Sequence, residues 1–134
     1  MQILISMIRI KMDNVTTFEK FEHEVIRNLL EKDTATNRLL REQYRNAQVV
    51  SREFTGVGFF TYFKVSESVE RVTEPVECAY GNIICDINGI KDFGGGVLFI
   101  EEGAMKCLEG YTFYDKWPTA ITSYSFHHMR SHDT

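Results

Sequence analysis

A single change in hydrophobic period, near Ala47, divides the sequence into two parts. Before Ala47, apolar side chains recur three or four residues apart, which places them on one face of a helix. After it, apolar residues alternate with polar or small ones, which places them on one face of a β-strand. Helices followed by a run of strands, with no return to the helical period, indicate an α+β fold.

Two helices are predicted before Ala47. The first is expected to begin with a capping box from Thr16 to Glu19, in which the two side chains satisfy free amide groups reciprocally, and to end near Lys32. Its buried face carries four apolar residues at helical spacing: Phe18, Phe21, Val25 and Leu29. The side chains expected to face solvent are Glu19, Lys20, Glu22, His23, Arg27 and Asn28.

The second helix is predicted to begin at Asp33 or Thr34, since either side chain can cap it. Its apolar side carries Leu39, Leu40 and Tyr44. Three arginines share another face because they lie three and four residues apart: Arg38, Arg41 and Arg45. They could hold a phosphate or a carboxylate, but we favour a solvated face in which they complement the helix dipole near the C-terminus.

The strongest strand pattern lies at residues 52–65, which read REFTGVGFFTYFKV. Alternation puts an almost wholly apolar set on one face, which we expect to be core: Val57, Phe59, Thr61, Phe63 and Val65. The other face is expected to be half covered or to form an interaction surface; it carries Gly58, Phe60, Tyr62 and Lys64. This strand is the best candidate for the middle of a sheet.

Further strands are predicted at residues 48–54, 80–87, 96–101, 105–114 and 121–126, with a tight hairpin turn at Glu102-Gly103. Because the connections are short, neighbouring strands should be antiparallel. The expected architecture is two N-terminal helices packed on one face of a curved, mostly antiparallel sheet of about five to six strands.

The 134 residues are expected to form one domain, because no repeat, linker or low-complexity segment interrupts them. Residues 1–12 are interpreted as a dispensable extension or an edge strand, and residues 127–134 as a flexible tail. Three cysteines without C-x-x-C spacing predict neither a disulfide framework nor a zinc site. Since no signal peptide or membrane-spanning stretch is apparent, we expect a cytoplasmic protein without a membrane partner.

The negative charge is concentrated in one part of the chain. The net charge is −4, yet residues 66–115 alone hold three Lys/Arg and ten Asp/Glu, a net charge of −7. This distribution argues against nucleic-acid binding, because phosphates need basic contacts. It suits a basic protein partner, although solubility alone would also account for it.

No motif predicts a cofactor, a metal ion or a set of catalytic residues. The glycines at 56–58 and 94–96 lack the sequence context of phosphate-binding loops. The histidines near the C-terminus, His127, His128 and His132, fall in the expected tail, where a metal site would have no fixed geometry. One alternative is a small enzyme or ligand-binding domain, if adjacent strands bring four residues together: Glu53, Glu109, Tyr111 and Asp115.

Three segments of the chain resemble a family of small, mostly uncharacterised bacterial proteins: VVSREFTGVGFFTYFKV, GGGVLFIEEG and CLEGYTFYDKWP. The resemblance spans about residues 25–118 and implies no catalytic residue. In type, a short acidic chain of this kind is similar to the immunity proteins of contact-dependent growth inhibition systems. That similarity implies a protein that neutralises a cognate toxin domain, such as a nuclease, by binding it.

We therefore predict a toxin-binding protein rather than an enzyme. Its acidic partner-binding residues are expected to be Glu67, Glu70, Glu74, Glu77, Asp92, Glu101, Glu102 and Asp115. Its aromatic anchors are expected among Tyr62, Tyr111 and Trp117, at least one of which core packing should claim. A third possibility is an assembly module that uses the face of Phe60 and Tyr62.

Overall fold

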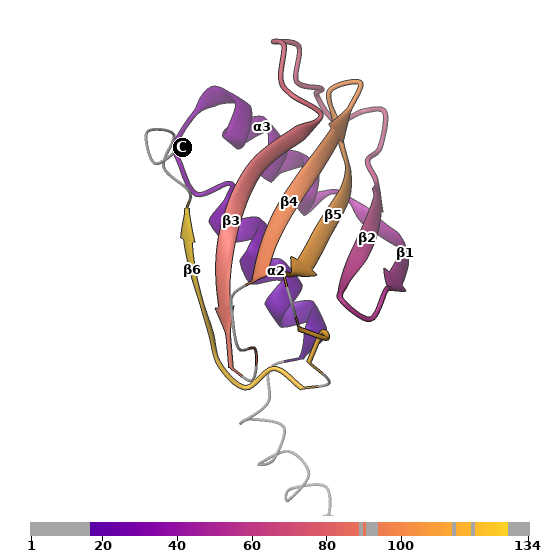
Figure 1. The fold of residues 1–134 in the computed structure, drawn as a ribbon. Coiled ribbons are helices and arrows are strands. Elements are labelled where there is room, and N and C mark those ends of the chain that lie inside the picture. The colour runs from indigo at the N-terminus through magenta and orange to yellow at the C-terminus, as the bar shows by residue number, and fades with distance from the viewer. Residues whose placement is uncertain (1–16, 89, 91–93, 114, 119, 129–134) are drawn as a thin grey trace, which may run out of the picture.

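The computed structural model describes residues 17–88, 90, 94–113, 115–118 and 120–128. In this part of the chain, two helices precede six strands that form one antiparallel sheet (Figure 1). The predicted α+β fold, with both helices packed on one face of a curved sheet, is confirmed. The elements are α2 (Phe18–Leu29), α3 (Ala35–Arg45), β1 (Gln48–Phe54), β2 (Gly58–Lys64), β3 (Ala79–Ile87), β4 (Gly94–Glu101), β5 (Ala104–Thr112) and β6 (Tyr124–His128).

The strands lie in the order β1-β2-β5-β4-β3-β6. The strand predicted for the middle of the sheet, β2, has a neighbour on each side, but β5 and β4 occupy the centre. The last strand begins at Tyr124 and ends at His128, so it extends two residues into the segment expected to be a tail. The segment at residues 1–12 lies outside the described residues.

Both ends of α2 differ from the sequence prediction, whereas the start of α3 agrees with it. The cap of α2 is Thr17, whose hydroxyl accepts from the amide of Lys20 at 3.2 Å, so the predicted box from Thr16 to Glu19 is wrong by one residue. This helix ends at Leu29 rather than near Lys32. Thr34 caps α3 as predicted, and its hydroxyl accepts from the amide of Asn37 at 3.0 Å.

The three arginines of α3 are engaged within the protein. Arg38 pairs with Asp33 at 2.8 Å, and Arg45 pairs with Glu42. Arg41 donates to the carbonyl oxygens of residues 30 and 32, which lie just beyond the end of α2. The arginine face therefore joins and caps helices, and its members already have acceptors of their own.

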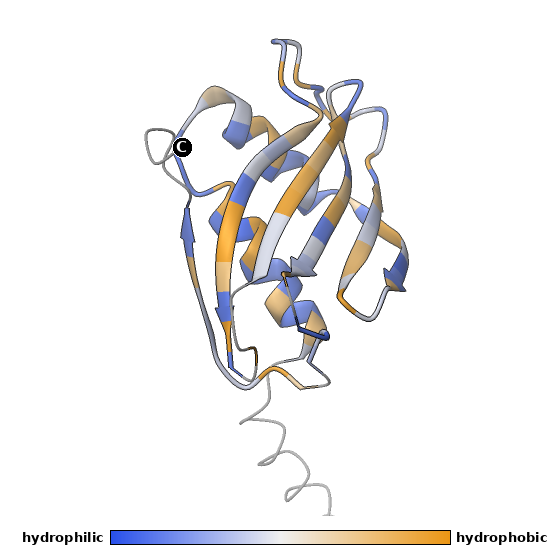
Figure 2. Cartoon of the chain, viewed as in Figure 1, coloured by the Kyte–Doolittle hydropathy of each residue, from blue (hydrophilic) through white to orange (hydrophobic). Residues whose placement is uncertain are grey.

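The hydrophobic core fills the space between the two helices and the inner face of the sheet. Hydrophobic positions are prominent on β3 and β4 and alternate with hydrophilic ones along α2, whereas β6 at one edge is largely polar (Figure 2). Four of the five residues expected in the core on β2 and just after it are buried: Phe59, Thr61, Phe63 and Val65. Val57 is 53% exposed because it precedes the strand, which begins at Gly58.

Two glycines on the inner face allow close packing. A Cβ at Gly96 would lie 3.0 Å from Cγ1 of Val25, so α2 approaches the sheet at this point. A Cβ at Gly110 would lie 2.1 Å from the ring of Phe59, which therefore lies directly across β5. The missing side chains let the helix and a large aromatic ring fit between neighbouring elements.

Candidate protein-binding surface

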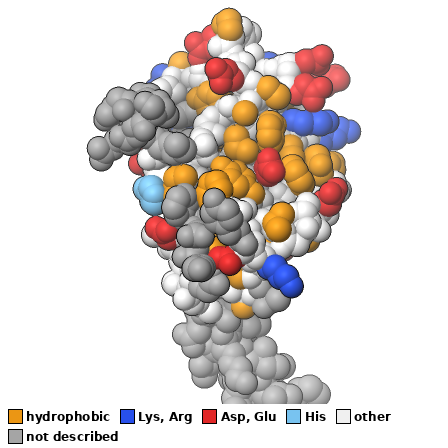
Figure 3. Space-filling model, in the orientation of Figure 1, with side chains coloured by type: hydrophobic (Ala, Val, Ile, Leu, Met, Phe, Trp, Pro, Cys, Tyr) orange, Lys and Arg blue, Asp and Glu red, His pale blue; other side chains and the backbone are white. Residues whose placement is uncertain are grey.

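The face of the sheet turned away from the helices carries a group of aromatic and aliphatic side chains that are partly exposed. The register places Tyr62 of β2 beside Cys107 of β5, which in turn lies beside Phe99 of β4. A second row contains Phe60, Glu109 and Val97. Hydrophobic side chains gather on this surface in Figure 3. We call it the outer face and define it by Phe60, Tyr62, Val97, Phe99, Cys107, Glu109 and Tyr111.

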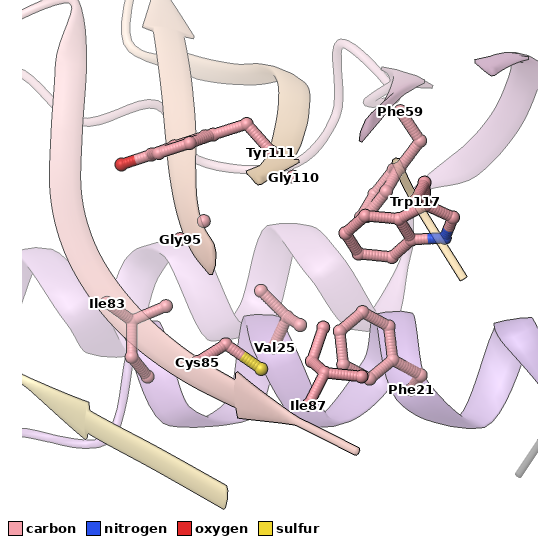
Figure 4. A pocket seen from close by; sticks show the side chains of 11 residues that line it. Phe21, Val25, Phe59, Ile83, Cys85, Ile87, Gly95, Gly110, Tyr111 and Trp117 are labelled. Atoms are coloured by element: carbon pink, nitrogen blue, oxygen red, sulfur yellow. The ribbon is translucent and has the colours of Figure 1, made fainter. Parts of the chain in front are cut away.

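The aromatic rings of the outer face lie against one another or against the sheet. Phe60 and Tyr62 stack with ring centroids 6.2 Å apart and planes inclined by 20°. The ring of Tyr111 lies across β4 at Gly95, where a Cβ would come within 2.5 Å of its Cζ and hydroxyl (Figure 4). The hydroxyl of Tyr111 donates to Asn82 at 3.4 Å. Rings held in this way offer contact area at little cost in conformational entropy.

Glu109 lies in the middle of the outer face, opposite Phe60 on one side and Val97 on the other. It accepts no hydrogen bond from any residue in the described part of the chain. Desolvation among these apolar neighbours raises the pKa of its carboxyl above the ordinary value. Glu109 is therefore a partly desolvated carboxylate that has no hydrogen-bond donor among the described residues.

The alternative carboxylate cluster does not assemble as a tight group. Glu53 of β1 and Glu109 of β5 do lie on the same face, but β2 separates their strands and Phe60 stands between them. Two strand spacings correspond to about 10 Å, too far for two carboxylates to share a proton. Asp115 follows the far end of β5, beyond Thr112. Paired acid–base chemistry is therefore not favoured by this arrangement.

Six glutamates gather at one end of the sheet, where the β2–β3 connection and the β4–β5 turn lie side by side (Figure 1). All six are exposed, and none forms an ion pair with a described basic residue. We call this region the acidic end; its members are Glu67, Glu70, Glu74, Glu77, Glu101 and Glu102. The structure thus brings together six of the eight acidic residues expected to bind a partner.

The two segments of the acidic end are held together by a buried glutamine. The side-chain amide of Gln43, which is fully buried on α3, donates to the carbonyl oxygens of Glu70 at 3.1 Å and Gly103 at 2.9 Å. Its carbonyl accepts from the amide of Met105 at 2.9 Å. The amide of Val72 also donates to Gly103 at 3.0 Å. Because every polar atom of Gln43 has a partner, this contact fixes the connection against the turn.

The turn itself has the backbone that the sequence predicted. Glu102 has a φ of 52° and Gly103 a φ of 78°, as a two-residue hairpin turn requires. A Cβ at Gly103 would lie 2.4 Å from the carbonyl oxygen of Val72, so glycine is needed both for its conformation and for the close approach.

The cation within the β2–β3 connection, Arg71, forms no ion pair with a described glutamate of the acidic end. Arg71 donates to the carbonyl oxygens of Ser66 at 2.7 Å and Val69 at 2.9 Å, so its guanidinium closes its own loop. Two lysines, Lys64 and Lys106, line a shallow hollow of about 230 Å³ together with Glu101 and Glu102. With six glutamates against Arg71, Lys64 and Lys106, the acidic end carries excess negative charge.

The remaining residues of the predicted binding set lie elsewhere. Trp117 packs edge-on against Phe21 at 5.7 Å and Phe59 at 5.2 Å, so core packing holds this one of the three candidate anchors. Asp115 lies in the same segment after β5, at the opposite end of the sheet from the acidic end. Asp92 lies outside the described residues.

An ion pair between the helices and the sheet was missed by sequence reasoning. Glu22, predicted to face solvent, is 4% exposed. It accepts from the guanidinium of Arg52 at 2.8 and 3.0 Å and from the hydroxyl of Thr61. The signal was an arginine and a threonine at inward positions of adjacent strands, since such residues need a polar partner.

The interior cavity and the thiols offer little for chemistry. A cavity of about 10 Å³ lies between α2 and the sheet, lined by apolar side chains that include Phe21, Val25 and Cys85 (Figure 4). It has room for about one water molecule. Burial raises the pKa of Cys85 to about 12 and that of Cys107 to about 11, so neither thiol is ionised near neutral pH.

Comparison with other proteins adds no family assignment. No model of a protein family, no curated protein and no solved structure was found to match the chain. Among the described residues, no three His, Cys, Asp or Glu side chains lie close enough to hold a metal ion. Neither described helix combines the length and the hydrophobicity needed to cross a membrane.

Proposed function

We propose that this protein binds and neutralises a cognate bacterial toxin domain, a nuclease, by covering the surface with which that domain grips its substrate. The observation that carries the proposal is the convergence of six exposed glutamates at the acidic end, which Gln43 holds in place. The partly exposed aromatic outer face lies on the same sheet and supplies apolar contact area. Charge for recognition and aromatic area for affinity are the two components of a protein interface.

The acidic end suits a partner that binds nucleic acid. A nuclease needs a basic surface because its substrate carries one negative charge per phosphate. An inhibitor with the opposite charge gains chiefly in association rate and in selectivity. The glutamates of the acidic end lie on surface segments and have no described cationic partner, so their field is available to a basic protein.

Affinity should come from a few anchors on the outer face. Tyr62 and Tyr111 are partly exposed there, and Tyr is among the residue types that dominate binding energy at protein interfaces. The acidic end would then guide the encounter, while the outer face would slow dissociation.

The proposal can be tested with the product of a toxin reading frame next to this gene. Replacing Glu70, Glu74 and Glu77 by Lys should slow association by at least about tenfold, because long-range attraction is reversed. The control changes Glu19, Glu31 and Glu42 to Lys, which alters net charge equally on the helices and the connection between them. An equal loss in both variants would show that net charge alone matters, and no binding by the unchanged protein would refute the function.

A further inference from the structure

The outer face contains a carboxylate, Glu109, that has no cationic partner among the described residues. Glu109 lies among Phe60, Val97 and Cys107, accepts no hydrogen bond from the described residues, and has a carboxyl whose pKa burial has raised. A second carboxylate, Glu53, lies on the other side of Phe60 in the same row of the sheet. A partly desolvated carboxylate is costly to the folded protein unless a cation or a donor reaches it.

The cations in the described part of the chain do not pair with this carboxylate. Arg52 is on β1, the edge strand beyond β2, and its side chain turns to the inner face and pairs there with Glu22. Lys64 and Lys106 lie in the hollow beside Glu101 and Glu102 at the acidic end. No described Lys or Arg therefore forms an ion pair with Glu109.

We propose that the outer face receives an arginine side chain of a partner protein, whose guanidinium pairs with Glu109 while lying against the ring of Phe60. This inference rests on the proposed function as a protein-binding protein and names the chemistry of the contact. Phe60 is directly opposite Glu109 in the β2–β5 register, so one planar cation can touch both. Apolar neighbours of that arginine would cover the rest of the outer face, around Val97 and Phe99.

Arginine fits this site better than lysine. Its planar group donates two parallel hydrogen bonds to a carboxylate and stacks on an aromatic ring at the same time. It is also more weakly hydrated than an ammonium group, so it loses less on entering a site from which neighbouring rings exclude water. Tyr62, stacked beside Phe60, extends the aromatic surface available to the guanidinium.

The contact should be a centre of binding energy rather than a contact at the rim. Glu109 is on β5, one of the two central strands, and has large side chains around it. Residues at the centre of an interface lose water when the partner docks, and a charge pair enclosed in this way is held more strongly than one at the exposed margin.

A display library of random peptides provides a probe that needs no known partner. Peptides selected on the immobilised protein should share an arginine flanked by apolar residues. Their binding should weaken by at least about tenfold for Glu109→Gln, which keeps the shape and removes the charge, and by less than about twofold for Glu53→Gln. Replacing the arginine of a selected peptide by alanine should abolish the difference between the protein and its Glu109→Gln variant.

Three results would overturn the inference. The first is a set of selected peptides without a basic residue, and the second is equal binding by the protein and its Glu109→Gln variant. The third is a dimer of this chain alone, seen by sedimentation, that Tyr62→Ala dissociates, because a second copy would then occupy the outer face. The proposed function is judged separately: a toxin that binds Glu109→Gln as tightly as the unchanged protein leaves the function intact and refutes only the inference.

Discussion

The two faces of the sheet differ in the partners that they provide for a carboxylate. On the inner face, Glu22 is almost completely buried, yet Arg52 and Thr61 satisfy it. On the outer face, Glu109 keeps part of its exposure but no described donor reaches it. The inner carboxylate is part of how the helices and the sheet fit together. The outer one opposes folding slightly, which is the usual mark of a residue retained for another purpose.

The same contrast holds for aromatic residues of one strand. Phe59 and Phe63 of β2 point inward and are 1% and 4% exposed, whereas Phe60 and Tyr62 point outward and are partly exposed. Nothing in the composition of the strand distinguishes the two sets. Their difference arises because α2 and α3 cover one face of the sheet and leave the other open.

The largest expected difference between the two faces is in the cost of losing an aromatic ring. Phe63→Ala should lower the free energy of unfolding by about 3–5 kcal/mol, because it leaves a cavity in a packed core. Phe60→Ala should cost about 1 kcal/mol or less, since water can fill the space left on the open face. Denaturant titration of the two variants measures both values, and equal losses would show that the outer face is covered in the free protein.

The inner ion pair provides the next largest effect. Arg52→Ala should cost about 3 kcal/mol, the lower end of the range for a broken buried pair, because the arginine is partly exposed. Replacing both members, as in Glu22→Leu with Arg52→Met, should restore most of that stability, since no charge is then left buried. A double variant that is as unstable as Arg52→Ala would show that the ion pair itself stabilises the fold.

Substitutions at two glycines compare how freely an aromatic ring can move on each face of the sheet. Gly110→Ala places a Cβ against Phe59 in the core, so the ring has no space to move, and the loss should be about 1–3 kcal/mol. Gly95→Ala meets the far end of Tyr111, which can swing toward solvent, so its cost should be below about 1 kcal/mol. Thermal melting of both variants gives the comparison, and a reversed order would contradict the assignment of the open face.

The smallest expected effect is the contribution of Glu109 to the pH dependence of stability. Because its carboxyl has a pKa raised above the ordinary 4.5, the folded state binds this proton more tightly than the unfolded chain does. Its stabilising contribution is therefore present at low pH and is lost as pH rises through the folded-state pKa. The Glu109→Gln variant should gain stability relative to the unchanged protein as the pH rises above the ordinary pKa of 4.5. A constant difference over that range would show that Glu109 is not desolvated.

Much of the fold follows from local patterns. The switch of period at Ala47 marks the start of β1 at Gln48, and alternation separates Phe59 and Phe63 from Phe60 and Tyr62. The hairpin turn at Glu102-Gly103 is likewise local, because its backbone depends on two residues. These features involve neighbours in sequence, and a single sequence contains the information that they need.

The remaining features depend on contacts between distant segments. The position of β5 between β2 and β4 decides that Glu109 faces Phe60, and no local pattern specifies which strands pair. Glu22 was predicted to face solvent because helical spacing alone cannot show that Arg52 and Thr61 lie within hydrogen-bond reach of it on the sheet. The acidic residues could be named from the sequence. Their convergence depends on the tertiary contacts that hold the β2–β3 connection against the β4–β5 turn.

The hydrogen bonds of Gln43 also bear on the order of folding. Its three hydrogen bonds join residues 27, 60 and 62 positions apart in the chain, and the two longest cannot form until the β4–β5 turn exists and α3 has docked. Contacts across such separations are slow to form because a long loop must first close. During synthesis, the glutamates of the β2–β3 connection emerge well before the turn that orders them. A binding-competent acidic end is therefore expected only late in the maturation of each new chain.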